Sequence, residues 1–203
     1  MYALVKDNSI SKIITNPKAM VIGNVRYPAK IFQLWSESEL NAIGIYEVIT
    51  DSTNKKDEAY YINTNEQFDY ANNQVTRSWG TATPKRLEDE NAVDEDGKNI
   101  LDDDGNQVIN YGLKTEKKRI VKQQASRLLE KTDWHNHKAL DDDTYTIPDN
   151  IKSYRADVRA KSNEMESQID ACTNVDELKA LYEYTEQEDG TQTRPLAEFP
   201  KEI

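Results

Sequence analysis

The chain has two histidines, His135 and His137, within the segment "LLEKTDWHNHKAL", and three aspartates follow at Asp141, Asp142 and Asp143. Imidazole and carboxylate groups are the ligands of zinc and iron sites, so these residue types could hold a metal. On a helix, however, residues two positions apart do not face each other, and only an extended segment would bring both rings together. The i, i+4 histidine spacing of helical metal motifs is also absent. We therefore expect no metal here.

The letters His-Asn-His also suggest a nuclease, but HNH nucleases take their name from residues spread through a ββα-metal fold. A nuclease site would have to admit phosphate, and this chain has a formal net charge of −11 and a pI near 4.8. Such a charge repels nucleic acid and anionic membranes. The sequence therefore predicts neither partner and favours a protein partner with a neutral or basic face.

An acidic stretch between residues 86 and 110 contains the consecutive segments "VDEDGKNI" and "LDDDGNQV", which repeat with a period of eight. Their Asp-x-Asp-Gly pattern is similar to part of an EF-hand loop. With Gly97 or Gly105 at the sixth loop position, however, the first position is apolar and the twelfth is not glutamate. We interpret Asp96-Gly97 and Asp104-Gly105 as tight turns of a short acidic β-meander or linker.

Other catalytic patterns are missing from the sequence. The seven glycines are too scattered for a phosphate-binding loop, and no G-x-S-x-G nucleophile elbow occurs. Cys172 lies on an apolar helical stripe, where a cysteine is more often a small core residue than a nucleophile. We therefore predict that the chain is not an enzyme and needs no cofactor.

The composition is that of a soluble protein. Hydrophobic residues make up 36% and charged residues 31% of the 203 residues, and the single cysteine excludes an intramolecular disulfide. Lys6 and Asp7 interrupt the start before an apolar signal-peptide region can form. No apolar run approaches the ~20 residues of a membrane helix.

The elements predict an α+β fold that begins with a small β-rich domain, residues 1–80. Hairpin turns are expected at Asp7-Asn8 and Asn72-Asn73, because these residues tolerate positive φ. Between them the segment "SESELNAIG" predicts one short helix, with Ser36 as N-cap and Glu39 in a capping box. A strand is expected at residues 45–50. An acidic, turn-rich linker, residues 81–111, follows.

Residues 112–184 are predicted to form a helical hairpin or three-helix unit, and residues 185–203 an extended C-terminal arm. The apolar positions recur at helical spacing; the buried face of the first helix is expected to be Leu113, Ile120, Val121, Ala125, Leu128 and Leu129. The second helix begins near Pro148 and carries a stripe that ends at Cys172. Asn174 is expected to cap the third helix, three residues before Glu177.

The histidine segment is then interpreted as a corner between two antiparallel helices. Leu128 and Leu129 are the last apolar positions of the first helix, and Lys131 suits its C-terminal end. Asp133 can cap or turn the chain, and the Trp134 indole is expected to pack between this helix and the next. A loop through Asp143 would lead to the second helix.

The helical half is similar to the tail assembly chaperone (tail-fibre assembly) proteins of tailed bacteriophages. The similarity is strongest over residues 112–180, in "LKTEKKRIVKQQASRLLEKTDW" and "YRADVRAKSNEMESQIDACTNVDEL", and looser in the N-terminal half. The family's leucine pair and Thr-Asp-Trp corner, followed by a tyrosine-arginine pair and a further arginine, correspond here to Leu128, Leu129, Thr132, Asp133, Trp134, Tyr154, Arg155 and Arg159. A second tryptophan that often precedes the tyrosine is replaced by Ser153.

The resemblance implies a non-enzymatic protein that binds a tail-fibre or other tail protein in the host cytoplasm and assists its folding, trimerisation or attachment. The alternative is a structural subunit that stays in the virion tail, because polar, acidic segments order more easily against neighbours. Self-association is left open. The partner-binding positions to test first are Trp134, Tyr154, Arg155 and Arg159. For the two aromatic residues, burial in the core is the competing interpretation.

Overall fold

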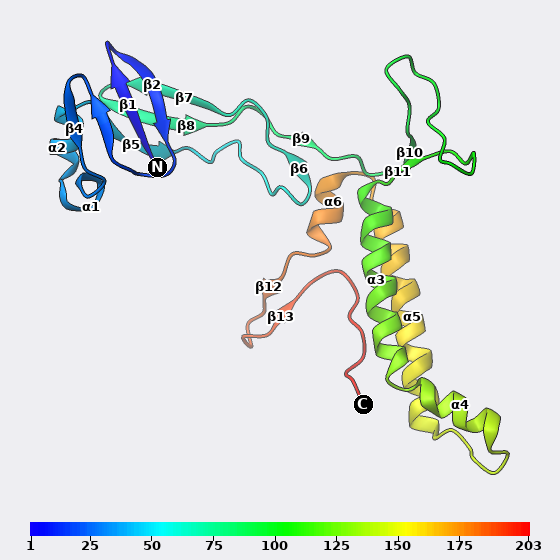
Figure 1. The fold of residues 1–203 in the computed structure, drawn as a ribbon. Helices are drawn as coiled ribbons and strands as arrows, with labels where there is room; N and C mark the ends of the chain where they lie inside the picture. The colour runs from blue at the N-terminus through cyan, green and yellow to red at the C-terminus, as the bar shows by residue number, and fades with distance from the viewer. The chain divides into compact units, whose positions relative to one another are not determined.

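The computed structural model describes residues 1–203 and confirms the α+β class. The chain divides into two compact units, Met1–Pro84 and Lys85–Ile203 (Figure 1). The first is built on strands and the second mainly on helices. The residues predicted as a separate acidic linker belong largely to the second unit.

A five-stranded sheet forms the centre of the first unit, with the strand order β2-β1-β5-β8-β7. Its strands are β1 (Tyr2–Lys6), β2 (Ser9–Ile14), β5 (Ile45–Thr50), β7 (Gln67–Ala71) and β8 (Gln74–Ser78). Strands β5 and β8 pair in parallel, and the other neighbours pair antiparallel. The sheet therefore joins two sequence-local hairpins through one central strand.

The two predicted hairpin turns are confirmed. Asp7 and Asn8 have φ of 52° and 59°, and Asn72 and Asn73 have φ of 51° and 59°. Two consecutive residues with positive φ define the turn whose twist matches that of paired strands. These turns therefore fix the register of β1 with β2 and of β7 with β8.

Each face of the sheet has its own apolar cluster. Ala3 and Val75 are fully buried on one face, and Ile45 is fully buried on the other. Neighbouring residues of a strand point to opposite faces, so Ala3 and Leu4 pack in different clusters. The first strand thus contributes to both.

The predicted helix is present as α2 (Glu37–Ala42), with the complete capping box between Ser36 and Glu39. The prediction of only one helix in this region was wrong, since α1 (Ile31–Leu34) precedes it. Four residues are too few to show a helical period, and packing of the buried Ile31 holds this turn in place. The short hairpin β3–β4 (Met20–Ile22, Val25–Tyr27) and the antiparallel pair of β6 (Tyr61–Ile62) with β9 (Thr83–Pro84) complete the unit.

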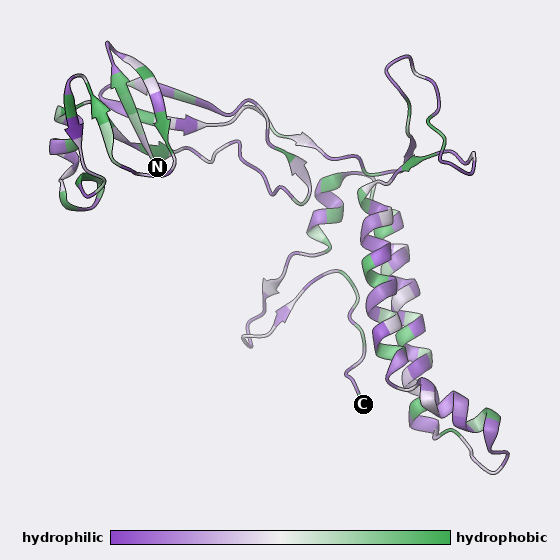
Figure 2. Ribbon diagram, in the orientation of Figure 1, coloured by the Kyte–Doolittle hydropathy of each residue, from purple (hydrophilic) through white to green (hydrophobic).

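Two long helices, α3 (Leu113–Glu130) and α5 (Asp149–Ala171), lie side by side in the second unit (Figure 1). Their ribbons are largely hydrophilic, with hydrophobic positions at intervals (Figure 2). The buried residues of the two helices are Lys114, Val121, Ala125, Tyr154, Arg155, Val158, Ser162, Met165 and Ile169. Ile120, expected on the buried face, is 43% exposed. The neighbouring Val121, which is 2% exposed, occupies the buried position instead.

The remaining elements of this unit are short. They are β10 (Glu90–Asn91), β11 (Ile109–Asn110), α4 (Asp133–Asp141), α6 (Val175–Ala180), β12 (Thr185–Glu186) and β13 (Gln192–Thr193). Cys172 is buried, as predicted for a core residue. No helix of the structure has the length and apolar character needed to cross a membrane.

The C-terminal stretch, residues 185–203, has no helix but is not a free arm. After the β12–β13 hairpin, Leu196 is 2% exposed and its backbone N–H donates to Leu181 O at 3.0 Å. The Ala197 N–H donates to Gln168 Oε1 on α5 at 2.8 Å. The stretch is therefore fastened to the helical unit.

The cap of α6 makes a pH-dependent contribution to stability. Asn174 Oδ1 accepts from the Glu177 N–H at 2.9 Å, and the Glu177 carboxylate accepts from the Thr173 N–H at 2.7 Å. The Thr173 backbone and hydroxyl hydrogen bonds lower the pKa of Glu177 from its usual 4.5. A lowered folded-state pKa stabilises the folded state above the unfolded pKa.

We expect this stabilisation to be lost as the pH falls below about 4.5 and through the folded-state pKa of Glu177. NMR titration of the Glu177 carboxyl should show the lowered pKa, and thermal unfolding of Glu177→Gln should depend less on pH in that range than unfolding of the native chain. An unshifted titration would contradict the cap. Glu188→Gln, in the β12–β13 loop, is the matched control.

Candidate partner-binding site

The predicted corner contains a short helix, α4 (Asp133–Asp141), rather than a loop through Asp143. Both histidines therefore lie on a helix; His135 is 8% exposed, and His137 is exposed. No three His, Cys, Asp or Glu side chains in the structure are grouped so that they could hold a metal ion. The segment instead joins α3 to α5.

Arg155 fastens the corner from α5. Its Nη1 donates to Leu129 O at 2.8 Å and to Thr132 Oγ1 at 2.7 Å, and its Nη2 lies 2.8 Å from Asp133 Oδ1. Leu129 O is one of the carbonyls left without a helical partner at the end of α3. The guanidinium therefore caps α3 and fixes the start of α4, and its residue is only 8% exposed.

The other motif residues support this cap. Thr132 is buried and its hydroxyl also donates to Leu129 O at 2.9 Å. Leu128 and Leu129 are half-buried and pack against the cluster of Ala125, Tyr154 and Val158. Leu129, Thr132 and Asp133 contact Arg155 directly, and Leu128 packs beside them, so these four residues of the motif form one structural unit with Arg155.

The sequence predicts that the Trp134 indole packs between the helices, and this prediction is wrong. Trp134 is 54% exposed. Neighbouring residues of a helix point about 100° apart, so Trp134 and His135 lie on different parts of the α4 surface. His135 takes the inner position, where its Nδ1 is hydrogen-bonded to the Tyr145 hydroxyl. The indole therefore points outward.

The exposed indole is nevertheless held in place. Its ring stacks on the His135 ring with centroids 3.7 Å apart, and the Tyr145 ring lies 6.4 Å away. Lys138 Nζ lies 4.4 Å from the centroid of the Tyr145 ring. We name these three rings, Trp134, His135 and Tyr145, the aromatic platform.

The other predicted binding residues are placed differently. Tyr154 is 5% exposed and Arg155 is 8% exposed, so both serve the interior of the helical unit. Arg159 is exposed, and its Nη1 donates to Arg155 O at 3.3 Å. Only Trp134 and Arg159 are therefore available to a partner. The contribution of His135 and Tyr145 was missed, since ten residues separate them and no sequence period relates them.

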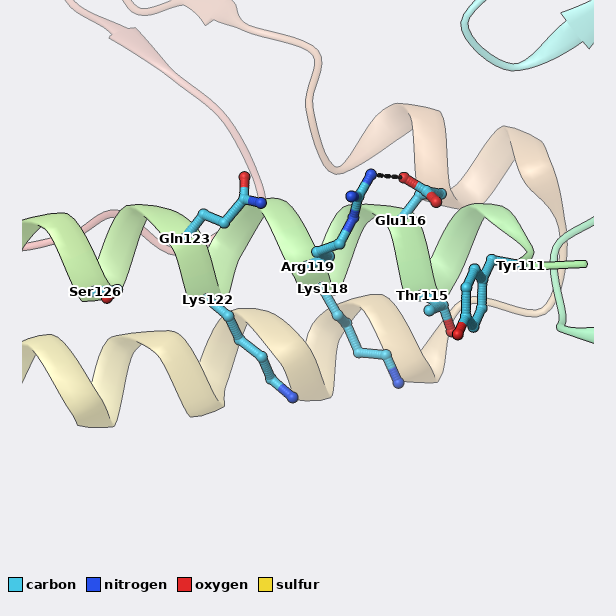
Figure 3. Close-up of a pocket in the computed structure, with 8 residues that line it drawn as sticks. All are labelled: Tyr111, Thr115, Glu116, Lys118, Arg119, Lys122, Gln123 and Ser126. Atoms are coloured by element: carbon cyan, nitrogen blue, oxygen red, sulfur yellow. Dashed lines mark hydrogen bonds and ion pairs between the residues drawn. The ribbon is translucent and has the colours of Figure 1, made fainter. Parts of the chain in front are cut away.

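A groove along α3 is a second candidate surface, and it contains basic side chains. It is lined by Tyr111, Thr115, Glu116, Lys118, Arg119, Lys122, Gln123 and Ser126 (Figure 3). Lys118 Nζ lies 2.7 Å from Asp170 Oδ1, and Lys122 Nζ lies 3.3 Å from Glu166 Oε2. The hydrogen bond to Asp170 raises the pKa of Lys118. The cations of this groove are thus largely neutralised by carboxylates of α3 and α5.

The thiol of Cys172, the single cysteine, is not part of either surface. Cys172 is 6% exposed, and its Sγ lies 3.4 Å from Gln168 O. Burial raises the pKa of this thiol, and the nearby Glu177 adds to the shift. A raised pKa keeps a cysteine in its less nucleophilic thiol form.

Comparisons of the chain with protein-family models, with curated proteins and with solved structures found no match.

Proposed function

We propose that the chain is a non-enzymatic, tail-fibre-associated assembly protein, which binds a phage fibre in the host cytoplasm and assists its folding, trimerisation or attachment. The observation that carries this proposal is the exposed Trp134 on a corner that Arg155 locks. The resemblance of residues 112–180 to tail assembly chaperones supplies the class of partner.

An immobilised, exposed tryptophan suits protein recognition. Tryptophan and arginine are enriched among the residues that dominate binding energy, and a ring that is already held loses little entropy on binding. Trp134 is stacked on His135, which in turn is hydrogen-bonded to Tyr145. The aromatic platform thus presents an exposed indole that needs no rearrangement to bind.

The charge agrees with a protein client. A net charge of −11 disfavours nucleic acid and anionic membranes. Unassembled β-rich chains expose strand edges that aggregate, and a folded acidic partner can cover them while it remains soluble itself.

Replacing Trp134 by alanine is expected to weaken binding of the purified fibre at least tenfold, because a central aromatic contact contributes about 2 kcal/mol or more. Thermal stability should change little, since the side chain is 54% exposed. Isothermal titration calorimetry with a purified phage tail fibre measures the change in affinity, and circular dichroism measures the thermal stability.

Leu140→Ala is the matched control, because Leu140 is on the same helix and is 80% exposed. If Trp134→Ala bound the fibre as tightly as the native chain does, the aromatic platform would not be the binding site. Failure of the native chain to bind or to raise the yield of soluble trimer would remove the proposed function.

The alternative, a subunit that stays in the tail, predicts that the chain is present in purified virions. The ordered acidic segment does not favour this alternative, because backbone hydrogen bonds within the segment hold it without a neighbouring protein. Mass spectrometry of particles separates the two functions: presence at a fixed ratio supports a structural subunit, and absence supports a transient assembly factor.

A further inference from the structure

The last part of the chain, residues 194–202, is an extended segment that follows β13 and contains neither helix nor strand (Figure 1). We name it the C-terminal strap. Residues 183–193, which lead into it through the β12–β13 hairpin, are all exposed. The strap is therefore held in place by its own contacts with the helices and not by the segment before it.

A glutamine of α5 binds the backbone of the strap through both ends of its amide. Gln168 Nε2 donates to Pro195 O at 3.0 Å, and Gln168 Oε1 accepts from the Ala197 N–H at 2.8 Å. The N–H of Leu196, between them, donates to Leu181 O at 3.0 Å. Main-chain hydrogen bonds of this kind supply affinity for an extended peptide, and pockets for its side chains supply specificity.

Three side chains of the strap, spaced three residues apart, contact the helical unit. Leu196 is 2% exposed. Phe199 is half-buried and packs against the cluster of α3 and α5 that contains Tyr154. Glu202 forms an ion pair with Lys131 at the end of α3. The strap therefore reaches from α5 to the end of α3 and covers part of the helix pair.

The strap leaves part of this surface unused. A hollow beside Phe199 is lined by the strap residues Arg194 and Glu198 and by Gln124, Arg127, Leu128 and Lys131. Arg127 is exposed there and forms no ion pair. A peptide with a larger ring at the position of Phe199, and with an acidic side chain beside Arg127, would gain apolar burial and a charge-assisted hydrogen bond that the strap lacks.

We propose that the surface under the strap is a binding groove for an extended segment of a partner protein, and that the strap is its built-in occupant. The partner segment has a leucine, an aromatic residue three positions later and an acidic residue three positions after that, as the strap has at Leu196, Phe199 and Glu202. This inference goes beyond the proposed function and uses no residue of the aromatic platform.

A tethered occupant closes a groove even when its own contacts are modest. The strap belongs to the same chain, so its effective concentration at the groove is on the order of millimolar. A free segment replaces the strap only when it binds the groove more tightly, because a ligand shifts an equilibrium by no more than its differential affinity. The hollow beside Phe199 and the unpaired Arg127 supply that difference.

The test uses the full chain and a fluorescent peptide with the sequence of residues 194–203, RPLAEFPKEI. Leu196→Ser with Phe199→Ser opens the strap, and fluorescence anisotropy should show at least tenfold tighter binding of the peptide to this variant than to the native chain. Phe199→Ser with Glu202→Gln keeps the buried leucine and its stability, and it should shift the affinity in the same direction. Circular dichroism shows that each variant is folded.

A peptide with tryptophan in place of its phenylalanine tests displacement of the strap. The indole should fill the hollow, so this peptide should bind the native chain about fivefold more tightly than the peptide of native sequence does. That ratio is the effect expected for about 40 Å² of additional buried apolar surface.

Two controls test recognition of the peptide. A peptide with serine in place of both the leucine and the phenylalanine should not bind the opened variant. Gln168→Ala, added to the opened variant, removes both amide hydrogen bonds to the peptide backbone and should weaken binding about tenfold. Gln123→Ala, at an exposed position of α3, is the matched substitution and should leave the affinity unchanged.

Each result decides one part of the proposal. A folded, opened variant that does not bind the peptide overturns the groove. Equal affinity of the native and opened chains overturns the strap as its occupant, and equal affinity of the two aromatic peptides overturns displacement by a partner. None of these results bears on the aromatic platform, which Trp134→Ala tests separately.

Discussion

Replacing Arg155 by alanine is expected to lower the free energy of unfolding of the helical unit by about 3 kcal/mol, the scale for removing one partner of a buried, hydrogen-bonded pair. The variant loses the cap on Leu129 O, the bond to Thr132 Oγ1 and the ion pair with Asp133. Urea unfolding followed by circular dichroism at 222 nm measures the loss, because α3 and α5 dominate that signal.

Arg155→Lys should recover only part of this loss. Lysine keeps the charge but lacks the planar guanidinium, which binds Leu129 O, Thr132 Oγ1 and the Asp133 carboxylate at the same time. Arg159→Ala is the matched control, since Arg159 is exposed on the same helix. If Arg155→Ala were as stable as Arg159→Ala, the corner would not depend on this cap.

Replacing Leu196 by alanine is expected to cost about 3 kcal/mol, as for other fully buried leucines. Leu196 is 2% exposed, although it lies in a stretch without helix and only three residues beyond the short strand β13. Alanine keeps the backbone hydrogen bond to Leu181 O but loses the buried side chain, so the substitution loosens the last residues from the helical unit.

The loss should appear in the same urea transition, and limited proteolysis should cut the variant first within residues 185–203. Leu140→Ala, at a position 80% exposed, is the control and should unfold as the native chain does. A Leu196 variant of native stability and native protease resistance would show that the C-terminal stretch is not fastened.

The sequence by itself determined the local structure of this protein. Asp7-Asn8 and Asn72-Asn73 form the hairpin turns, because few other residues tolerate positive φ there. Ser36 and Glu39 cap α2, and Asn174 caps α6, as their spacing predicted. The period of the apolar residues predicted α3 and α5. In each case the partners are separated by a few residues, so the chain pattern contains the information.

The tertiary structure decided the contacts between residues far apart in the chain. Strand β5 pairs in parallel with β8, and Arg155 reaches back 26 residues to the end of α3. Trp134 faces solvent because His135, hydrogen-bonded to Tyr145, takes the inner position. No spacing rule fixes such choices, because they depend on how whole elements pack, and this is why the corner was recognised while its exposed face was assigned wrongly.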